Sequence, residues 1–244
     1  LNNNSAAAII ADEVALLATI TTDITDGIRG LSTTNFSFAI TGNDSDETLI
    51  GTNSNDQIIS GNGNDTINGL AGNDNITLGS DRDTIVFNGF NSSSDGSNVI
   101  ATFQSADKYD FSSFMSGGLI TNVSNNKIII ATPEQLNDHQ NGIPISNNQV
   151  YITEAPTKNS IDTAAELAVA MTNGVGTIDA IDLSANTNAI LVIGGADDDT
   201  IHFIYGIEND STAALNHSEI HLLGTVTTDI TDGIQGLVVD NFIF

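Results

Sequence analysis

Acidic side chains recur every nine residues between residues 42 and 86. Five consecutive nine-residue blocks each carry an acid at the sixth position and an aliphatic residue at the eighth. The acids are Glu47, Asp56, Asp65, Asp74 and Asp83, and the aliphatic residues are Leu49, Ile58, Ile67, Ile76 and Ile85. Carboxylates combined with turn carbonyls suit a hard cation with a flexible oxygen shell, and Ca²⁺ fits such loops better than Mg²⁺. The spacing therefore predicts Ca²⁺ sites. Because uncompensated carboxylates repel one another, it also predicts that folding depends on the cation.

The same spacing indicates the elements that position these acids. Each block predicts a tight turn followed by about three extended residues, with the eighth side chain pointing inward, so that stacked coils build a ladder of Ile and Leu. Turn positions with positive φ favour glycine or asparagine. The candidate metal-binding residues are the aspartates and turn glycines of these blocks: Asp56, Asp65, Asp74, Asp83, Gly61, Gly63 and Gly72. A solenoid that binds no metal is the alternative interpretation.

The blocks resemble the glycine- and aspartate-rich nonapeptide repeats of RTX proteins, Gly-Gly-x-Gly-x-Asp-x-U-x, which form a Ca²⁺-loaded parallel β-roll. The resemblance implies that successive blocks alternate between the two sides of the roll. Asp56 and Asp74 would then lie on one side and Asp65 and Asp83 on the other, with ions shared between neighbours on the same side. The first block departs from the pattern, since Glu47 stands where aspartate is expected.

A single block of the same form recurs far from the others, at residues 194–202. Its sixth position is Asp199, which belongs to the candidate metal ligands. One block cannot stack on itself as the tandem blocks do. It either binds one Ca²⁺ against another loop or forms only an acidic hairpin turn.

The charge balance excludes several classes of partner. The chain has 5 Lys and Arg against 31 Asp and Glu, a formal net charge of −26. Such a negative field disfavours nucleic acids and anionic membrane surfaces and favours cations. The absence of cysteine excludes disulfides, thiol catalysis and Cys-ligated zinc or iron–sulfur sites. No apolar run approaches the roughly 20 residues that span a bilayer, so no membrane insertion is expected.

The two ends of the chain repeat each other. Residues 1–38 align without a gap to residues 207–244, with 21 of 38 positions identical. We therefore expect the natural protein to contain tandem modules, with residues 1–38 as the end of a preceding module. A single domain with related edge segments is the alternative.

The predicted fold class is mainly β, with a short Ca²⁺-binding parallel β-roll flanked by β-rich modules and one or two short helices. Helix signals occur at Thr132–Gln135 and over residues 162–171. Phenylalanines at 103, 111 and 114 are expected to cap the end of the roll. Four segments follow: 1–40 as the C-terminal part of a preceding β module, 41–87 as the roll, 88–118 as the capping segment, and 119–244 as a β-rich module whose end repeats 1–38.

Signals of catalysis are missing from the sequence. Neither a His-Glu-x-x-His zinc motif nor a Gly-x-Ser-x-Gly nucleophile elbow occurs, and we expect no enzyme. His217 and His221 are four residues apart, as two metal ligands on a helix would be. Strand is the predicted structure there, so we expect both side chains at the surface.

The resemblance implies a secreted bacterial protein that leaves the cell by type I secretion and acts at the extracellular cell surface. The leading hypothesis is a calcium-binding structural module of an S-layer or filament-forming subunit, whose partners are neighbouring copies of the same protein. The alternative is an RTX adhesin extender or binding module, with a cell-surface glycan as a further partner. A roll that accompanies an enzyme domain elsewhere in the protein is a third hypothesis.

Overall fold

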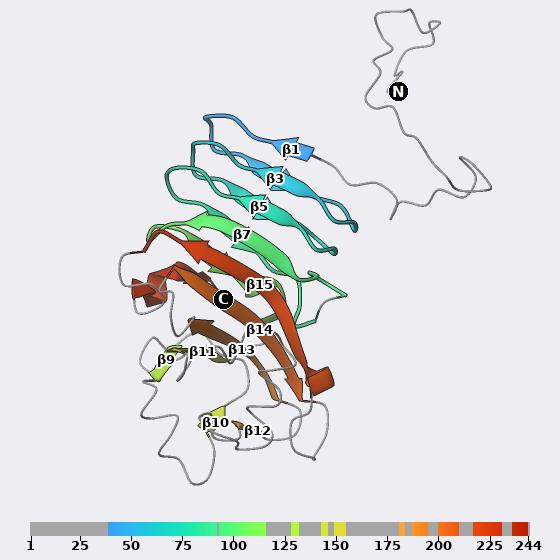
Figure 1. Cartoon of the computed structure of the whole chain (residues 1–244), viewed down its shortest axis with the longest axis vertical. Helices are drawn as coiled ribbons and strands as arrows, with labels where there is room; N and C mark the ends of the chain where they lie inside the picture. Colours follow the sequence, from blue (N-terminus) through green and yellow to red (C-terminus); the bar gives the residue numbers. More distant parts are fainter. Residues whose placement is uncertain are drawn as a thin grey trace, which may run out of the picture. The chain divides into compact units, whose positions relative to one another are not determined.

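Short strands joined by turns make up most of the computed structural model (Figure 1), which describes residues 39–91, 93–115, 128–131, 143–145, 149–154, 181–183, 187–194, 200–209, 217–230 and 236–243. The chain divides into two compact units, Leu1–Asn35 and Phe36–Phe244. Residues 1–38 lie outside the described residues, so every element below belongs to the second unit.

Residues 39–86 wind into a parallel β-roll, as the blocks predicted. Strands β1 (Ala39–Thr41), β3 (Gln57–Ile59) and β5 (Asn75–Thr77) form one sheet of the roll, and β2 (Thr48–Ile50), β4 (Thr66–Asn68) and β6 (Thr84–Val86) form the other. Each strand pairs in parallel with the strand one coil later, and the register advances by 18 residues, as in Ile58↔Ile76. One coil therefore contains two of the nine-residue blocks, which places successive blocks on opposite sheets.

The eighth residues of the blocks form the core ladder of the roll. Ile58 and Ile67 are fully buried, and Ile76 and Ile85 are each 1% exposed. Leu49, in the first coil, is only partly buried. Full burial of one aliphatic side chain contributes about 2 kcal/mol of transfer free energy, so the ladder is a main source of stability in the roll.

A further coil continues the roll beyond the nine-residue blocks. β7 (Asn98–Phe103) pairs in parallel with β5, and β8 (Lys108–Asp110) pairs in parallel with β6. The register advances here by 24 residues, as in Ile85↔Tyr109, because the loop between β6 and β7 is longer than the other turns. A short helix, α1 (Ser112–Met115), follows β8. Part of the segment expected to cap the roll is thus a coil of the roll.

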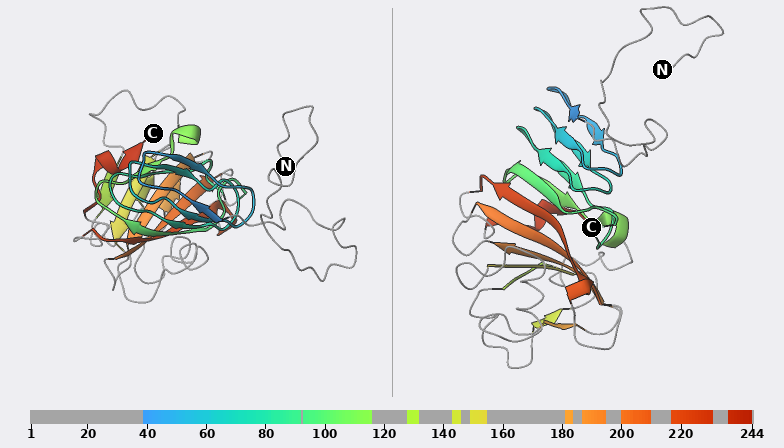
Figure 2. Two further views of the ribbon diagram at one scale, coloured as in Figure 1. Left: turned by 90° about the horizontal axis from the view of Figure 1, so that it is seen from above. Right: turned by 45° about the vertical axis from the view of Figure 1, so that its right-hand side comes forward.

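The sheet that contains β1 continues from the roll into the C-terminal half of the chain (Figures 1 and 2). Beyond β7 come β15 (Ile220–Thr228), β14 (Ile201–Asn209), β13 (Thr187–Gly194), β11 (Gln149–Glu154) and β9 (Ile128–Ala131), in that order. β15 is parallel to β7, whereas β14 is antiparallel to both β13 and β15. The last strand, β16 (Phe242–Ile243), pairs in parallel with β8 and extends the second sheet. C-terminal strands therefore cover the last coil on both sheets.

The remaining described elements are short. The 3₁₀ helices η4 (His217–Glu219) and η6 (Val239–Asn241) precede β15 and β16, and β10 (Ile143–Ile145) pairs with β12 (Ile181–Leu183). The strand predicted at His217 therefore begins only at Ile220. Within the described ranges, no helix is long and apolar enough to cross a lipid bilayer. The helices predicted at 132–135 and 162–171 lie outside the described residues, and the predicted mainly β class with a parallel β-roll is confirmed.

Candidate calcium sites along the roll

The sixth-position acids stand in two columns, one on each sheet of the roll. Each acid directly precedes a strand, and the side chains of Asp65, Asp74 and Asp83 reach back to the preceding coil. Asp74 Oδ1 accepts a hydrogen bond from the N–H of Asp56 at 2.8 Å, and Asp83 Oδ1 accepts one from the N–H of Asp65 at 3.0 Å. Asp65 Oδ1 in turn accepts the N–H of Glu47 at 2.9 Å. These are the same-side pairs that the alternation of blocks implied.

Both columns continue into the coil formed by β7 and β8. Asn98 Oδ1 accepts the N–H of Asp74 at 2.9 Å, and Asp107 Oδ1 accepts the N–H of Asp83 at 2.8 Å. The nine-residue period is interrupted before Asn98 and Asp107, so the block pattern did not predict these two residues as site residues. In each block the acid stands two residues before the inward side chain, and Asp107 stands two residues before Tyr109 in the same way. This spacing is the signal that could have identified them.

The second carboxylate oxygen of each acid distinguishes two kinds of turn. In three turns, the N–H of the second residue of the block donates to that oxygen. The donor–acceptor pairs are Asn43 to Glu47 Oε2 (2.8 Å), Thr52 to Asp56 Oδ2 (2.5 Å) and Gly79 to Asp83 Oδ2 (3.3 Å). We call these the closed turns, because the carboxylate closes onto its own turn.

In the other two turns, the second residue of the block has a positive φ. These residues are Gly61 (φ 100°) and Leu70 (φ 64°). The acids of these turns are Asp65 and Asp74, each 1% exposed, and the Oδ2 atom of each is buried without a hydrogen-bond partner. We call these the open turns. They are the places in the roll where a carboxylate oxygen is left unsatisfied.

The open turns fit a calcium ion. A buried carboxylate oxygen without a partner costs free energy that a bound cation would offset. Among the residues that the structure describes, no three or more His, Cys, Asp and Glu side chains come together as a metal-binding group. Turn carbonyls would therefore have to supply most of the ligands, and a flexible set of carbonyl and carboxylate oxygens is typical of Ca²⁺.

The predicted glycines allow the coils to stack closely. Gly63 has φ 108° and Gly72 has φ 127°. A Cβ at these positions would lie 2.7 Å and 2.6 Å from the carbonyl carbons of Ser45 and Ser54 in the preceding coil. A Cβ at Gly61 would likewise collide with backbone of the preceding coil. These three residues therefore stand where the backbone conformation and the spacing both require glycine.

Burial raises the pKa of carboxyl groups in both columns. It raises the pKa of Asp74 to about 7 and that of Asp107 to about 6, and it also raises the pKa of Asp83. Repulsion from the neighbouring acid of the same column adds to each rise, while hydrogen bonds from backbone N–H groups oppose it. In the metal-free protein, the columns therefore hold negative charge at a cost in folding free energy.

The isolated block at residues 194–202 joins an antiparallel hairpin. β13 and β14 pair through Gly194↔His202, whereas coils of the roll pair in parallel. Asp199 itself lies outside the described residues. Its role as a metal ligand stays a prediction.

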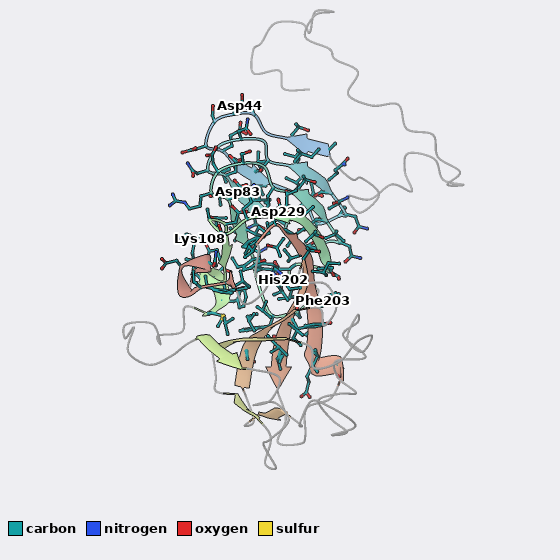
Figure 3. All side chains as sticks on the ribbon, turned by 60° about the vertical axis from the view of Figure 1, so that its left-hand side comes forward. Asp44, Asp83, Lys108, His202, Phe203 and Asp229 are labelled. Carbon is teal, nitrogen blue, oxygen red and sulfur yellow. The ribbon has the colours of Figure 1, made fainter. Side chains whose placement is uncertain are left out.

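A buried histidine, which the sequence analysis did not single out, joins the roll to the C-terminal sheet. His202 on β14 is fully buried, the Oη of Tyr109 lies 2.6 Å from its Nε2, and its Nδ1 has no hydrogen-bond partner. Burial lowers the pKa of His202 to about 3, so the ring is neutral near pH 7. His221 lies on β15, and its Nε2 is 3.7 Å from Glu208 Oε2. Figure 3 labels Asp83 on the roll and His202 on the C-terminal sheet.

Comparison with known proteins places the repeats in a family. Three overlapping stretches, residues 41–76, 50–85 and 59–92, match the RTX calcium-binding nonapeptide repeat. Among solved structures, the chain is similar to the AlgE6R2 subunit of the Azotobacter vinelandii mannuronan C5-epimerase, at 19% identity with a TM-score of 0.37 over 84% of this chain and 91% of that chain. Comparison with curated proteins gives no match. The family match covers the coils that carry both open turns.

Proposed function

We propose, on the premise that residues 41–92 are RTX calcium-binding repeats, that this chain is a structural module of a secreted bacterial cell-surface protein. The proposed protein is an S-layer or filament-forming subunit that folds and assembles in extracellular Ca²⁺. The observation that carries the proposal is the pair of buried, unpartnered oxygens, Asp65 Oδ2 and Asp74 Oδ2.

The residues of the open turns couple cation binding to the stacking of coils. Asp65 and Asp74 lie in different columns, so each would hold its own ion together with carbonyls of the turns around Gly61, Gly63 and Gly72, and the bound ions supply the positive charge that the columns lack. Because Asp74 Oδ1 also accepts an N–H from the preceding coil, a carboxylate held in place keeps two coils in register. Extracellular modules bind Ca²⁺ with Kd values of about 10⁻⁴–10⁻³ M. The chain would accordingly stay unfolded at low cytosolic Ca²⁺ and fold outside the cell.

Two features of the sheets support a structural role. The nine-stranded sheet joins the roll and the C-terminal part by continuous hydrogen bonding. Within the described residues, β1 and β2 stand at the edges of the two sheets, which leaves backbone groups for pairing with another chain. The partner in this proposal is a neighbouring copy of the same protein.

A Ca²⁺ titration followed by far-UV circular dichroism tests the folding step. Starting from the chain in EGTA, we expect a cooperative gain of β signal with a midpoint of about 10⁻⁴–10⁻³ M Ca²⁺. The same concentration of Mg²⁺ is the control and should not produce this gain, because Mg²⁺ demands a strict octahedron. A chain equally folded in excess EGTA would contradict the proposal.

An RTX adhesin extender is the second candidate, and the repeat of residues 1–38 at 207–244 favours it, because arrays of spacer modules have such repeats. Electron microscopy of the Ca²⁺-loaded protein separates the two. A lattice or filament subunit should form ordered sheets or fibres. An extender should stay monomeric, with glycan binding supplied by another domain.

A further inference from the structure

The C-terminal strands occupy the end of the roll's last coil, formed by β7 and β8, which we call the roll end. β15 pairs in parallel with β7, and Thr228 Oγ1 donates a hydrogen bond to the carbonyl of Phe103 at 2.8 Å. The N–H of Asp229 donates to the same carbonyl at 2.9 Å. Leu223 and Val226 on β15 are fully buried. Strand pairing and an apolar strip therefore hold this half of the contact.

The turn before β16 and β16 itself complete the contact on the other sheet. Asn241 Nδ2 donates to the carbonyls of Ser105 and Asp107 at 2.9 Å and 2.8 Å. Phe242 packs against Tyr109 with 5.7 Å between the ring centroids. Asn241 is 2% exposed and Phe242 is 6% exposed. We call residues 220–243 the cap.

The N-terminal segment carries the same cap residues. At six of the positions that bond to the roll end or are buried with its core, the side chains of the two segments are identical, whereas Ile20 stands at the position of the buried Val226. The pairs are Leu17/Leu223, Thr22/Thr228, Asp23/Asp229, Leu31/Leu237, Asn35/Asn241 and Phe36/Phe242. The sequence of residues 1–38 therefore contains the groups that a cap needs.

Positions that differ between the segments leave the contact possible. Val238 is 54% exposed, and Ser32 replaces it in the N-terminal segment. Ala18 replaces Gly224 of β15. A Cβ at Gly224 would find its nearest neighbour, Ile100 Cδ1, at 3.3 Å, so a methyl group fits with a small shift of that side chain.

Phe36 cannot take the place of Phe242 at the roll end of its own chain. Phe36 precedes Ala39, the first residue of β1, by three residues, a span of at most about 11 Å. β1 and β7 are three strand spacings apart in their sheet, about 14 Å, and Phe242 lies one strand beyond β8. A cap that includes Phe36 would therefore have to cover another roll.

We propose that residues 1–38 are a second cap, which binds the roll end of a second copy of this chain by adding strands beside β7 and β8. The premise that copies associate rests on the proposed function. The two surfaces that meet are residues 1–38 of one copy and the roll end of the other. The chain's own cap competes for the roll end, because an intramolecular contact has a high effective concentration. Weakening that cap exposes the roll end, and a head-to-tail contact follows.

Sedimentation velocity of full-chain variants in Ca²⁺ tests the inference. Asn241→Ala with Phe242→Ala weakens the chain's own cap, and Asn35→Ala with Phe36→Ala removes the matched side chains from the N-terminal segment. We expect the first variant to self-associate at least about tenfold more tightly than the wild type. The variant that combines all four substitutions should lose that gain. The variant with only Asn35→Ala and Phe36→Ala should associate no more tightly than the wild type.

Two results would overturn the inference. One is equally tight association of the variant with all four substitutions and of the cap variant, which has only Asn241→Ala and Phe242→Ala. Exposed apolar surface alone would then explain the gain. The other is a cap variant without any gain whose circular dichroism in Ca²⁺ equals that of the wild type. If the cap variant does not fold in Ca²⁺, the self-association of the Asn241→Ala variant is compared with that of the Asn241→Ala, Asn35→Ala variant. Equally tight association of these two variants would likewise overturn the inference. Loss of Ca²⁺-dependent folding in the wild type would instead contradict the proposed function.

Discussion

At the scale of single residues, the backbone angle of one turn residue accompanies the presence or absence of a hydrogen bond to an acid of the roll. Asp56 and Asp74 occupy the same block position one coil apart. Asp56 Oδ2 accepts the N–H of Thr52 at 2.5 Å, whereas Asp74 Oδ2 has no partner. The difference follows the second residue of the turn, since Leu70 adopts φ 64° and Thr52 is not in the positive-φ region. We therefore expect identical acids at identical spacing to differ in their capacity to bind Ca²⁺.

Asp74→Asn should change stability in opposite directions with and without Ca²⁺. The amide keeps an oxygen that accepts the N–H of Asp56, but it has no charge to bury, so the residual β signal of the variant in EGTA should exceed that of the wild type. In Ca²⁺ the melting temperature should fall, because the variant loses a charged ligand and its Ca²⁺ affinity drops at least about tenfold. Asp240→Asn is the matched control, since Asp240 is exposed and belongs to neither column. Equal shifts of both variants in both buffers would contradict an ion at Asp74.

The metal-free protein should lose stability as the pH rises from about 4 to about 7, the interval between the ordinary and the raised pKa of Asp74. Burial raises the pKa of Asp74 to about 7 and that of Asp95 to about 6. A carboxyl group with a higher pKa in the folded state binds more protons when folded, so stability is greatest below the unfolded pKa and is lost as the pH passes the folded pKa.

Far-UV circular dichroism at about pH 5 and about pH 8 checks this linkage. In EGTA, the β signal should be weaker at the higher pH, because less of the chain is folded there. In saturating Ca²⁺ the order should reverse, because protons compete with the cation for the carboxylates. The same trend in both buffers would show that the buried acids are not the groups that bind the ion.

At the scale of elements, the turns set how closely the coils stack. The two open turns place positive φ at their second residue, and one of these residues, Leu70, carries a side chain that disfavours this conformation. Gly72, two residues later in the same turn, has φ 127° and faces the backbone of Ser54. The same turn therefore contains Leu70, where glycine would relieve an unfavourable backbone conformation, and Gly72, where glycine is required.

Leu70→Gly and Gly72→Ala should have opposite effects on the free energy of unfolding in Ca²⁺. A left-handed conformation costs an L-residue roughly 1–2 kcal/mol, so Leu70→Gly should stabilise the roll by about 1 kcal/mol. Gly72→Ala should destabilise it by at least about 1 kcal/mol, because a Cβ there is strained and also collides with the preceding coil. Urea denaturation measures both, and Leu70→Ala separates the backbone effect from lost side-chain contacts. A destabilised Leu70→Gly variant beside an unchanged Leu70→Ala variant would contradict the assignment.

At the scale of the whole molecule, the roll and the C-terminal strands share one core. The ladder of the roll continues from Ile85 to Tyr109, whose hydroxyl meets His202 of β14 at 2.6 Å. Phe103 stacks on Tyr109 with 4.4 Å between ring centroids, and His202 lies edge-on to both rings. We therefore expect the described parts of the second unit to unfold together.

Tyr109→Phe should lower the free energy of unfolding by about 1–3 kcal/mol, because the buried Nε2 of His202 loses its partner while Nδ1 already has none. The double variant Tyr109→Phe with His202→Leu should recover most of this loss, since replacing both partners by apolar groups can be nearly neutral. Thermal unfolding in Ca²⁺ measures both variants, and a single transition for each is expected. Additive losses in the double variant would contradict a specific Tyr109–His202 interaction.

The nine-residue spacing predicted stacked coils with an inward ladder, and the resemblance to RTX repeats implied the parallel roll and the two columns of acids. These features depend on contacts between neighbouring coils, such as Asp56 with Asp74, whose sequence separation of 18 residues is two blocks. Strand alternation and turn conformation are local properties, so the residue pattern contains them. The ligand roles of Asp56, Asp65, Asp74 and Asp83 stay predictions.

Contacts between distant segments decided the rest. No periodic pattern links Thr228 to Phe103, 125 residues earlier, yet this hydrogen bond belongs to the cap that covers the roll end. Likewise, the 24-residue coil, the burial of His202 and the choice between open and closed turns depend on how the coils and C-terminal strands pack. A sequence pattern specifies which side chains recur, but whether a carboxylate oxygen is buried without a donor depends on how the coils pack, as at Asp65 and Asp74.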